Sequence, residues 1–201
     1  VATLAVLFAL QALAGEPVTL TATAALVIGH AVALGSPRGQ AWLLMPALRG
    51  TAVAAVGLAL GGLLAAIQLL PLAGAVADSW RVLPKEDWSF WSLHPLGLAE
   101  AVAVHLFGDY FTTPHVQALP WMPVVNGGRE PLFFSIYFGP TLLALAALGA
   151  AGAHRKRYSV FWVGACVVGV VAAAGPYTPV YPFLRTYVPL LASFRFPVKY
   201  L

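Results

Sequence analysis

The sequence has few charged residues, too few to give a soluble domain its polar surface. Only 9% of the 201 residues are Asp, Glu, Lys or Arg, whereas 60% are hydrophobic. The mean hydropathy is +0.83. A chain of this composition cannot cover an apolar core with polar side chains, so an ordinary soluble domain is excluded. The composition predicts an integral membrane protein with the lipid bilayer as its partner.

Cysteine and acidic residues are also scarce. The single cysteine, Cys166, excludes an internal disulfide and lies in an apolar run. There are 11 Lys and Arg residues against 7 Asp and Glu residues. The cations are scattered between apolar segments and form no continuous basic face, which argues against a nucleic-acid partner. We therefore interpret the positive charge as a signal of membrane topology.

Four apolar segments are close to the roughly 20 residues that a helix needs to cross a bilayer, and a truncated fifth precedes them. They are 1–14, which is shorter than the rest, 18–34, 51–70, 133–152 and 158–174. These segments predict an all-α fold, a polytopic transmembrane helix bundle in which 1–201 is a single membrane domain. Pro140 is expected to kink its helix or to mark its beginning.

The charges predict how these spans are oriented. The loop at 35–50 and the short stretch at 154–157 carry cations and no acid, which is typical of cytoplasmic loops. All seven acids lie in segments that alternation then places outside. The long loop at 71–131 and the tail at 175–201 are therefore expected to be external, in a multi-pass membrane protein.

The external loop at 71–131 is long enough to have structure of its own. Four tryptophans suited to the headgroup layer lie in it, namely Trp80, Trp88, Trp91 and Trp121. The stretch 92–107 predicts an amphipathic helix on the membrane surface, entered through Ser92 and Pro95. Glu100 is the acid within that apolar stretch, and it either faces water or lies in a polar site.

Two pairs of charged residues are candidates for binding. Arg195 and Lys199 stand four residues apart beside aromatic residues, and they could bind a phosphate or simply anchor the chain among lipid headgroups. Asp78 and Arg81 are three residues apart and could pair on one helical face or, in a half-buried cleft, bind a sugar hydroxyl and a phosphate.

Metal binding has little support in the sequence. His105, Asp109 and His115 lie within eleven residues. Gly108 interrupts the helix that would bring the first two together, and no dense His and Cys spacing is present. We predict no metal site and no cofactor, with a divalent metal unsupported. We also expect the chain to be a fragment of a longer protein, because it begins at Val1 within an apolar run.

Six segments in one order resemble the bacterial YfhO-type membrane protein family. They are "ALQALAGEP" at 9–17, "AAIQLLPLAGAVADSWR" at 65–81, "WSLHPLGLAEAVAVHLFGD" at 91–109, "YFGPTLLALAALG" at 137–149, "GPYTPVYPFLRTYVP" at 175–189 and "FRFPVKYL" at 194–201. Together they cover nearly the whole chain. Glu16 departs from the family pattern, which has a histidine there, so no role is carried over to that turn.

The resemblance implies a function like that of the GT-C class of membrane glycosyltransferases. These enzymes move a sugar from a polyprenyl-phosphate carrier to a cell-envelope glycopolymer acceptor on the external face. Such chemistry needs a carboxylate as base and cations for the departing phosphate. By resemblance, Arg195, Lys199 and Arg81 are expected to bind phosphate. The principal carboxylate of the class is expected upstream of this chain, and Asp78, Glu100 and Asp109 are weaker candidates.

Two other classes of protein share many of these features. A transporter or lipid flippase would place ionisable residues within its spans, and these spans hold none except His30 near an end. A non-catalytic envelope assembly protein would share every bulk property and would lack the upstream acidic loop. The scarcity of ionisable residues in the spans counts against the transporter or flippase, but the sequence leaves both alternatives open.

Overall fold

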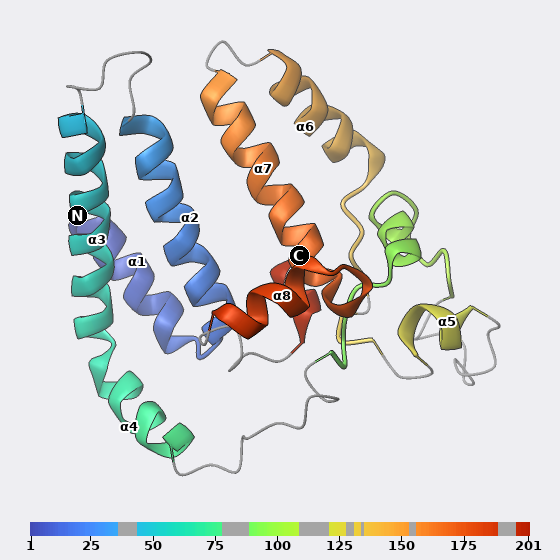
Figure 1. The fold of residues 1–201 in the computed structure, drawn as a ribbon, viewed down its shortest axis with the longest axis horizontal. Coiled ribbons are helices and arrows are strands. Elements are labelled where there is room, and N and C mark those ends of the chain that lie inside the picture. The colour runs from blue at the N-terminus through green and yellow to red at the C-terminus, as the bar shows by residue number, and fades with distance from the viewer. Residues whose placement is uncertain are drawn as a thin grey trace. The chain divides into compact units, whose positions relative to one another are not determined.

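All regular elements in the described part of the chain are helical. The computed structural model describes residues 1–35, 44–77, 89–108, 121–127, 131–133, 135–152, 156–188 and 196–201. Within these ranges there are helices and connecting turns but no strand (Figure 1). The all-α prediction is confirmed for these residues. The contacts divide the chain into two units, Val1–Leu83 with His154–Ala165, and Pro84–Ala153 with Cys166–Leu201.

The first unit contains helices α1 (Ala2–Leu13), α2 (Pro17–Gly35), α3 (Leu44–Leu64) and α4 (Ala66–Ala77). The chain reverses between α1 and α2 at Gly15, whose φ of 78° is accessible to glycine at little cost. Pro17 then begins α2, where its missing N–H is no loss. Apolar sequence and turn chemistry therefore suffice to place this helical hairpin.

Two glycines let α1 approach α3 closely. Gly57 and Gly61 stand four residues apart on α3, so they share one face. A Cβ added at Gly57 would lie 2.7 Å from the Leu4 side chain, and one at Gly61 would lie 2.7 Å from the Ala5 carbonyl oxygen. The α1–α3 contact therefore depends on the missing side chains, as in small-xxx-small helix pairs.

The helix that the sequence predicts over 51–70 is divided in the structure. Helix α3 stops at Leu64, and the segment Ala66–Ala75 is bent by 74° from Leu48–Leu64. Ala65 at the bend is fully buried and packs in a cluster with Ala9 and Ala12 of α1. Within α4, Pro71 removes one of the hydrogen bonds that would favour a longer straight helix.

The second unit has shorter elements joined by longer connections. Its members are the 3₁₀ helix η2 (Pro95–Ala101), α5 (Met122–Asn126), α6 (Pro140–Gly152), the end of α7 (Lys156–Ala173), η4 (Gly175–Tyr177), α8 (Val180–Tyr187) and η5 (Pro197–Tyr200). Helix α6 begins at Pro140, one of the two outcomes expected for that proline. The sequence predicts a span over 133–152, but residues 133 and 135–139 are not helical in the structure.

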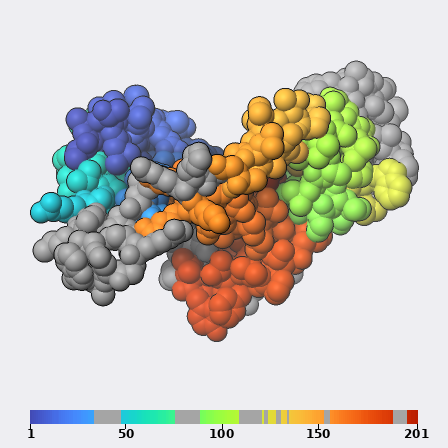
Figure 2. All heavy atoms as spheres, turned by 90° about the horizontal axis from the view of Figure 1, so that it is seen from above, coloured from blue at the N-terminus to red at the C-terminus, as the bar shows by residue number. Residues whose placement is uncertain are grey.

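The prediction of a continuous helix over 92–107 is wrong. Only Pro95–Ala101 is helical, in the 3₁₀ form, and turns follow it. The Ala101 carbonyl accepts hydrogen bonds from the backbone N–H groups of Phe138 and Gly139, both at 3.1 Å. His105 has a φ of 55°, which an α-helix cannot accommodate. In Figure 2 this segment, drawn in green, lies against α6, drawn in amber.

Helix α7 is, within the described ranges, the single continuous helix long and apolar enough to cross a membrane. The bent pair α3 and α4 would be a second candidate if the two helices form one span. Only 6% of the residues of α7 are buried within the chain. The core helix of a soluble protein would be mostly buried, so the apolar surface of α7 lacks the protein cover that such a helix has.

Candidate functional site

The segment from Trp91 to Ala101 is the centre of the second unit. The Leu93 N–H donates to the Ala173 carbonyl at the end of α7, at 2.8 Å, and the Val198 N–H donates to the Trp91 carbonyl at 3.0 Å. Leu93, Ala173 and Val198 also form a buried cluster. Three stretches that are far apart in the sequence are thereby held at one place.

His94 begins η2 by acting as its cap. Its Nδ1 accepts a hydrogen bond from the backbone N–H of Leu96 at 3.2 Å, in a segment where Pro95 supplies no N–H. The His94 ring also meets the ring of Tyr177 edge to face, with centroids 4.8 Å apart. These contacts agree with the structural role in a turn that its place before Pro95 suggests.

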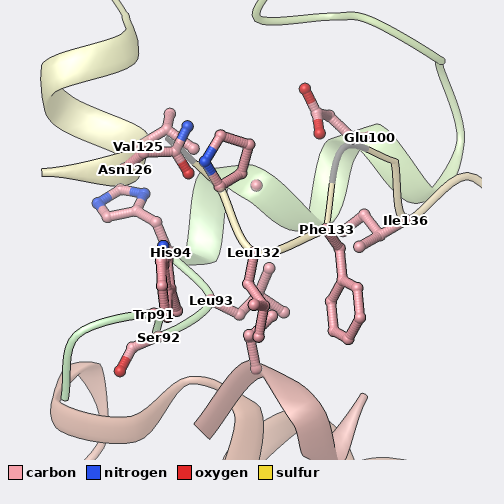
Figure 3. Close-up of a pocket in the computed structure, with 13 residues that line it drawn as sticks. Trp91, Ser92, Leu93, His94, Glu100, Val125, Asn126, Leu132, Phe133 and Ile136 are labelled. Atoms are coloured by element: carbon pink, nitrogen blue, oxygen red, sulfur yellow. The ribbon is translucent and has the colours of Figure 1, made fainter. Parts of the chain in front are cut away.

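A small pocket opens beside this segment (Figure 3). Its polar lining residues are Ser92, His94, Glu100 and Asn126, and the rest of its lining is largely apolar. In Figure 3, His94 and Asn126 lie on one side and Glu100 lies on the other. The cavity volume is about 50 Å³, which is room for a few water molecules but not for a sugar ring. Any larger ligand would have to contact the pocket from outside.

Glu100 is the charged residue of this pocket. Its side chain is half-buried, and burial raises the pKa of the carboxyl above its usual range. The backbone N–H of Phe107 and the nearby His105 act in the opposite direction but do not cancel that effect. A carboxyl with a raised pKa is a better proton acceptor than an ordinary glutamate, so Glu100 has a property that general-base chemistry requires.

Ser92 and His94 each form a hydrogen bond within the second unit. The Ser92 hydroxyl donates to the Ser89 carbonyl at 2.8 Å, and His94 Nδ1 is occupied by the cap of η2. Neither contact is the hydrogen bond between a nucleophile and a base that acyl-transfer sites show. The arrangement around Glu100 is therefore better suited to moving a proton than to covalent catalysis.

Lys199 lies in the C-terminal segment that contacts the pocket-forming residues. It is half-buried in η5, next to Val198, which lines the pocket. Its Nζ is 5.7 Å from the centroid of the Phe196 ring, within the range of a cation–π contact. Phe196 in turn meets Trp91 edge to face, with centroids 4.5 Å apart. Aromatic contacts therefore hold the cation in the unit that carries Glu100.

Arg185 is a second cation in this unit, and it is not among the residues that the sequence predicts for the site. It lies in the last turn of α8, four residues after Tyr181, and that spacing places the two on one helix face. Tyr181 is 1% exposed, and its ring centroid is 5.9 Å from that of Tyr200. Burial raises the pKa of both hydroxyls, and Arg185 opposes this effect. The i, i+4 spacing of Tyr181 and Arg185 is visible in the sequence and could have indicated that they share a helix face. The contact between Tyr181 and Tyr200 depends on the tertiary fold and could not be predicted from the sequence.

The other predicted site residues are not placed by the structure. Asp78, Arg81, Asp109 and Arg195 lie outside the described residues. His105 lies in a turn, and across the described ranges no three His, Cys, Asp or Glu side chains gather as a metal site would require. Of the six predicted site residues, the structure thus places Glu100 and Lys199, both in the second unit.

Comparison of the chain with models of protein families, with curated proteins and with solved structures finds no match.

Proposed function

We propose that this chain is part of a multi-pass protein of a bacterial plasma membrane. The observation that carries the proposal is the long apolar helix α7, in which only 6% of the residues are buried within the chain. Large apolar side chains on the other long helices are also exposed, among them Leu10, Leu63, Ile67 and Leu148. In water such a surface would cause aggregation, whereas in a bilayer it contacts lipid at no cost.

Within that membrane protein, we propose a glycosyltransferase of the GT-C kind. The enzyme would move a sugar from a polyprenyl-phosphate carrier to a cell-envelope glycopolymer on the external face. The ordered resemblance of six segments to the YfhO-type family supports this, and so does the occurrence of Glu100 and Lys199 in one unit. Lys199 and Arg195 would stabilise the departing phosphate, with Arg81 as a further contact.

Glu100 is the described acid best suited to assist the reaction. Its raised pKa makes the carboxylate a better acceptor for the proton of an acceptor hydroxyl. The small pocket beside it does not itself support a sugar site. The proposal therefore rests on the charged groups of the second unit.

Binding of polyprenyl phosphate tests the phosphate site. Radiolabelled polyprenyl phosphate is titrated onto the purified protein containing this chain, alongside the double variant Arg195→Gln/Lys199→Gln and the control Lys156→Gln. Lys156 is exposed at the start of α7 and belongs to no proposed site. Because each charge-assisted hydrogen bond contributes about 1.5–3 kcal/mol, we expect the double variant to bind at least about tenfold more weakly.

Three results separate the proposals. Weaker binding in the double variant, with Lys156→Gln unchanged, supports the phosphate site. Equal binding in all three proteins removes Arg195 and Lys199 from it. Phosphate-dependent binding without transfer of a labelled hexose from polyprenyl phosphate to envelope polymer contradicts the enzyme and favours an envelope assembly protein.

A further inference from the structure

Helix α8 is too short to cross a membrane but exposes an apolar face. Its eight residues extend about 12 Å at 1.5 Å per residue, against a hydrocarbon thickness of about 30 Å. It follows α7 directly through η4, where Gly175 has a φ of 54°. Figure 1 shows α8 running across the direction of α7 rather than continuing it. The chain therefore turns at the end of the apolar helix.

The two faces of α8 have opposite surroundings. Tyr181 is 1% exposed and packs toward the C-terminal segment, with Arg185 one turn later on the same side. Phe183 is 61% exposed and Tyr187 is 70% exposed, one turn apart, with ring centroids 4.7 Å from each other. Val180 and Leu184 extend this exposed face. One face thus anchors the helix in its unit, and the other is apolar and is left exposed by the residues that the structure describes.

The charge around α8 identifies what fits this face. Residues 175–201 include Arg185, Arg195 and Lys199 and no acidic residue. A cationic segment with an exposed tyrosine and phenylalanine complements an anionic lipid surface, where aromatic rings enter the headgroup layer and cations meet phosphate. A protein partner would satisfy the apolar face, but the one-sided charge favours lipid phosphate.

We propose that α8 lies in the plane of the membrane–water interface, with Phe183 and Tyr187 among the lipids. Through Tyr181 it then holds the C-terminal segment, and with it Lys199, at the depth of lipid phosphates. This inference rests on the proposed membrane location of the chain. The interfacial helix would then lie at α8, a segment other than 92–107, where the sequence predicts one.

Nitroxide labels at three positions test the proposal in the protein containing this chain. The first label is on the native Cys166, which is exposed on α7. The second and third are on Tyr187→Cys and Thr186→Cys, both in a Cys166→Ala background. Thr186 is an exposed neighbour on α8 that lies outside the apolar face. The vesicles are of phosphatidylcholine and phosphatidylglycerol, and the probes are oxygen, which concentrates in hydrocarbon, and a water-soluble nickel chelate.

We expect the three nitroxide labels to lie at different depths in the bilayer. The Cys166 label should collide mainly with oxygen, the Tyr187→Cys label should lie about 5–10 Å below the headgroups, and the Thr186→Cys label should collide mainly with nickel. If Cys166 reports hydrocarbon while Tyr187→Cys and Thr186→Cys report water equally, the interfacial helix is refuted and the membrane location stands. If Tyr187→Cys is shielded from both probes, a protein surface covers α8 and the inference is overturned. If Cys166 reports water, the membrane proposal itself fails.

Discussion

The helices within the first unit and the short elements within the second are held together by different kinds of contact. In the first, helices approach through glycine and alanine, as at Gly61 against the Ala5 backbone. In the second, short elements are joined by backbone hydrogen bonds and by aromatic edges such as Trp91 on Phe196. The apolar unit therefore depends on the absence of side chains, and the aromatic unit depends on their presence. The second unit is also where the placed candidate site residues lie.

The largest effect is expected where the first unit is most tightly packed. A leucine in Gly61→Leu must displace the Ala5 carbonyl, 2.7 Å from the added Cβ, and the Phe8 ring. We expect a loss of about 3 kcal/mol in the free energy of unfolding. Gly62→Leu is the matched control, since a Cβ added at Gly62 would meet nothing within 4 Å. Thermal unfolding in detergent measures both, and equal stability of the two variants would refute the close α1–α3 packing.

An intermediate effect is expected at Gly175, where the second unit turns. Its φ of 54° is unfavourable for alanine, and the added Cβ would collide with the Ser92 hydroxyl and crowd Pro197 at 3.0 Å. Gly175→Ala should lower the free energy of unfolding by about 2 kcal/mol. Gly127→Ala has a similar φ and open space, so it should cost about half as much. A larger loss at Gly127 would contradict the packing of Gly175 against Ser92.

The smallest effect concerns Glu100 and depends on pH. The pKa of Glu100 in the folded protein is raised above the ordinary 4.5. The contribution of its carboxyl to the free energy of unfolding is therefore fully present below pH 4.5 and is lost as the pH rises through the pKa of the folded state. Glu100→Gln should therefore be more stable than the wild type at neutral pH and equal to it below about pH 4. Unfolding by denaturant across this range measures the difference. A variant less stable at neutral pH would contradict the buried carboxyl.

The first unit is the part of the fold that could be predicted most closely from sequence. The apolar segments 1–14 and 18–34 correspond to α1 (Ala2–Leu13) and α2 (Pro17–Gly35), because Gly15 and Pro17 mark the turn between them. The division at Ala65 was not predictable, since it depends on contact with α1, a distant part of the chain. Local composition thus predicted helices, while their breaks depended on tertiary contacts.

The candidate site was harder to predict for the same reason. The apolar pattern at 92–107 is that of a helix, but the Ala101 carbonyl bonds to Phe138 and Gly139 instead of continuing one. Likewise, Arg185 gains its surroundings from Tyr200, fifteen residues further along the chain. Glu100 and Lys199 could be proposed from residue type alone, but their burial could not.

The membrane location is the central claim, and accessibility of single cysteines in intact cells tests it most directly. Val124→Cys and Lys156→Cys, each in a Cys166→Ala background, place thiols at exposed positions in the proposed external and cytoplasmic regions. An impermeant thiol reagent should label Val124→Cys at once and Lys156→Cys only after the membrane is permeabilised. Labelling of Lys156→Cys in intact cells with Val124→Cys protected, or equal labelling of both, would contradict the proposed arrangement.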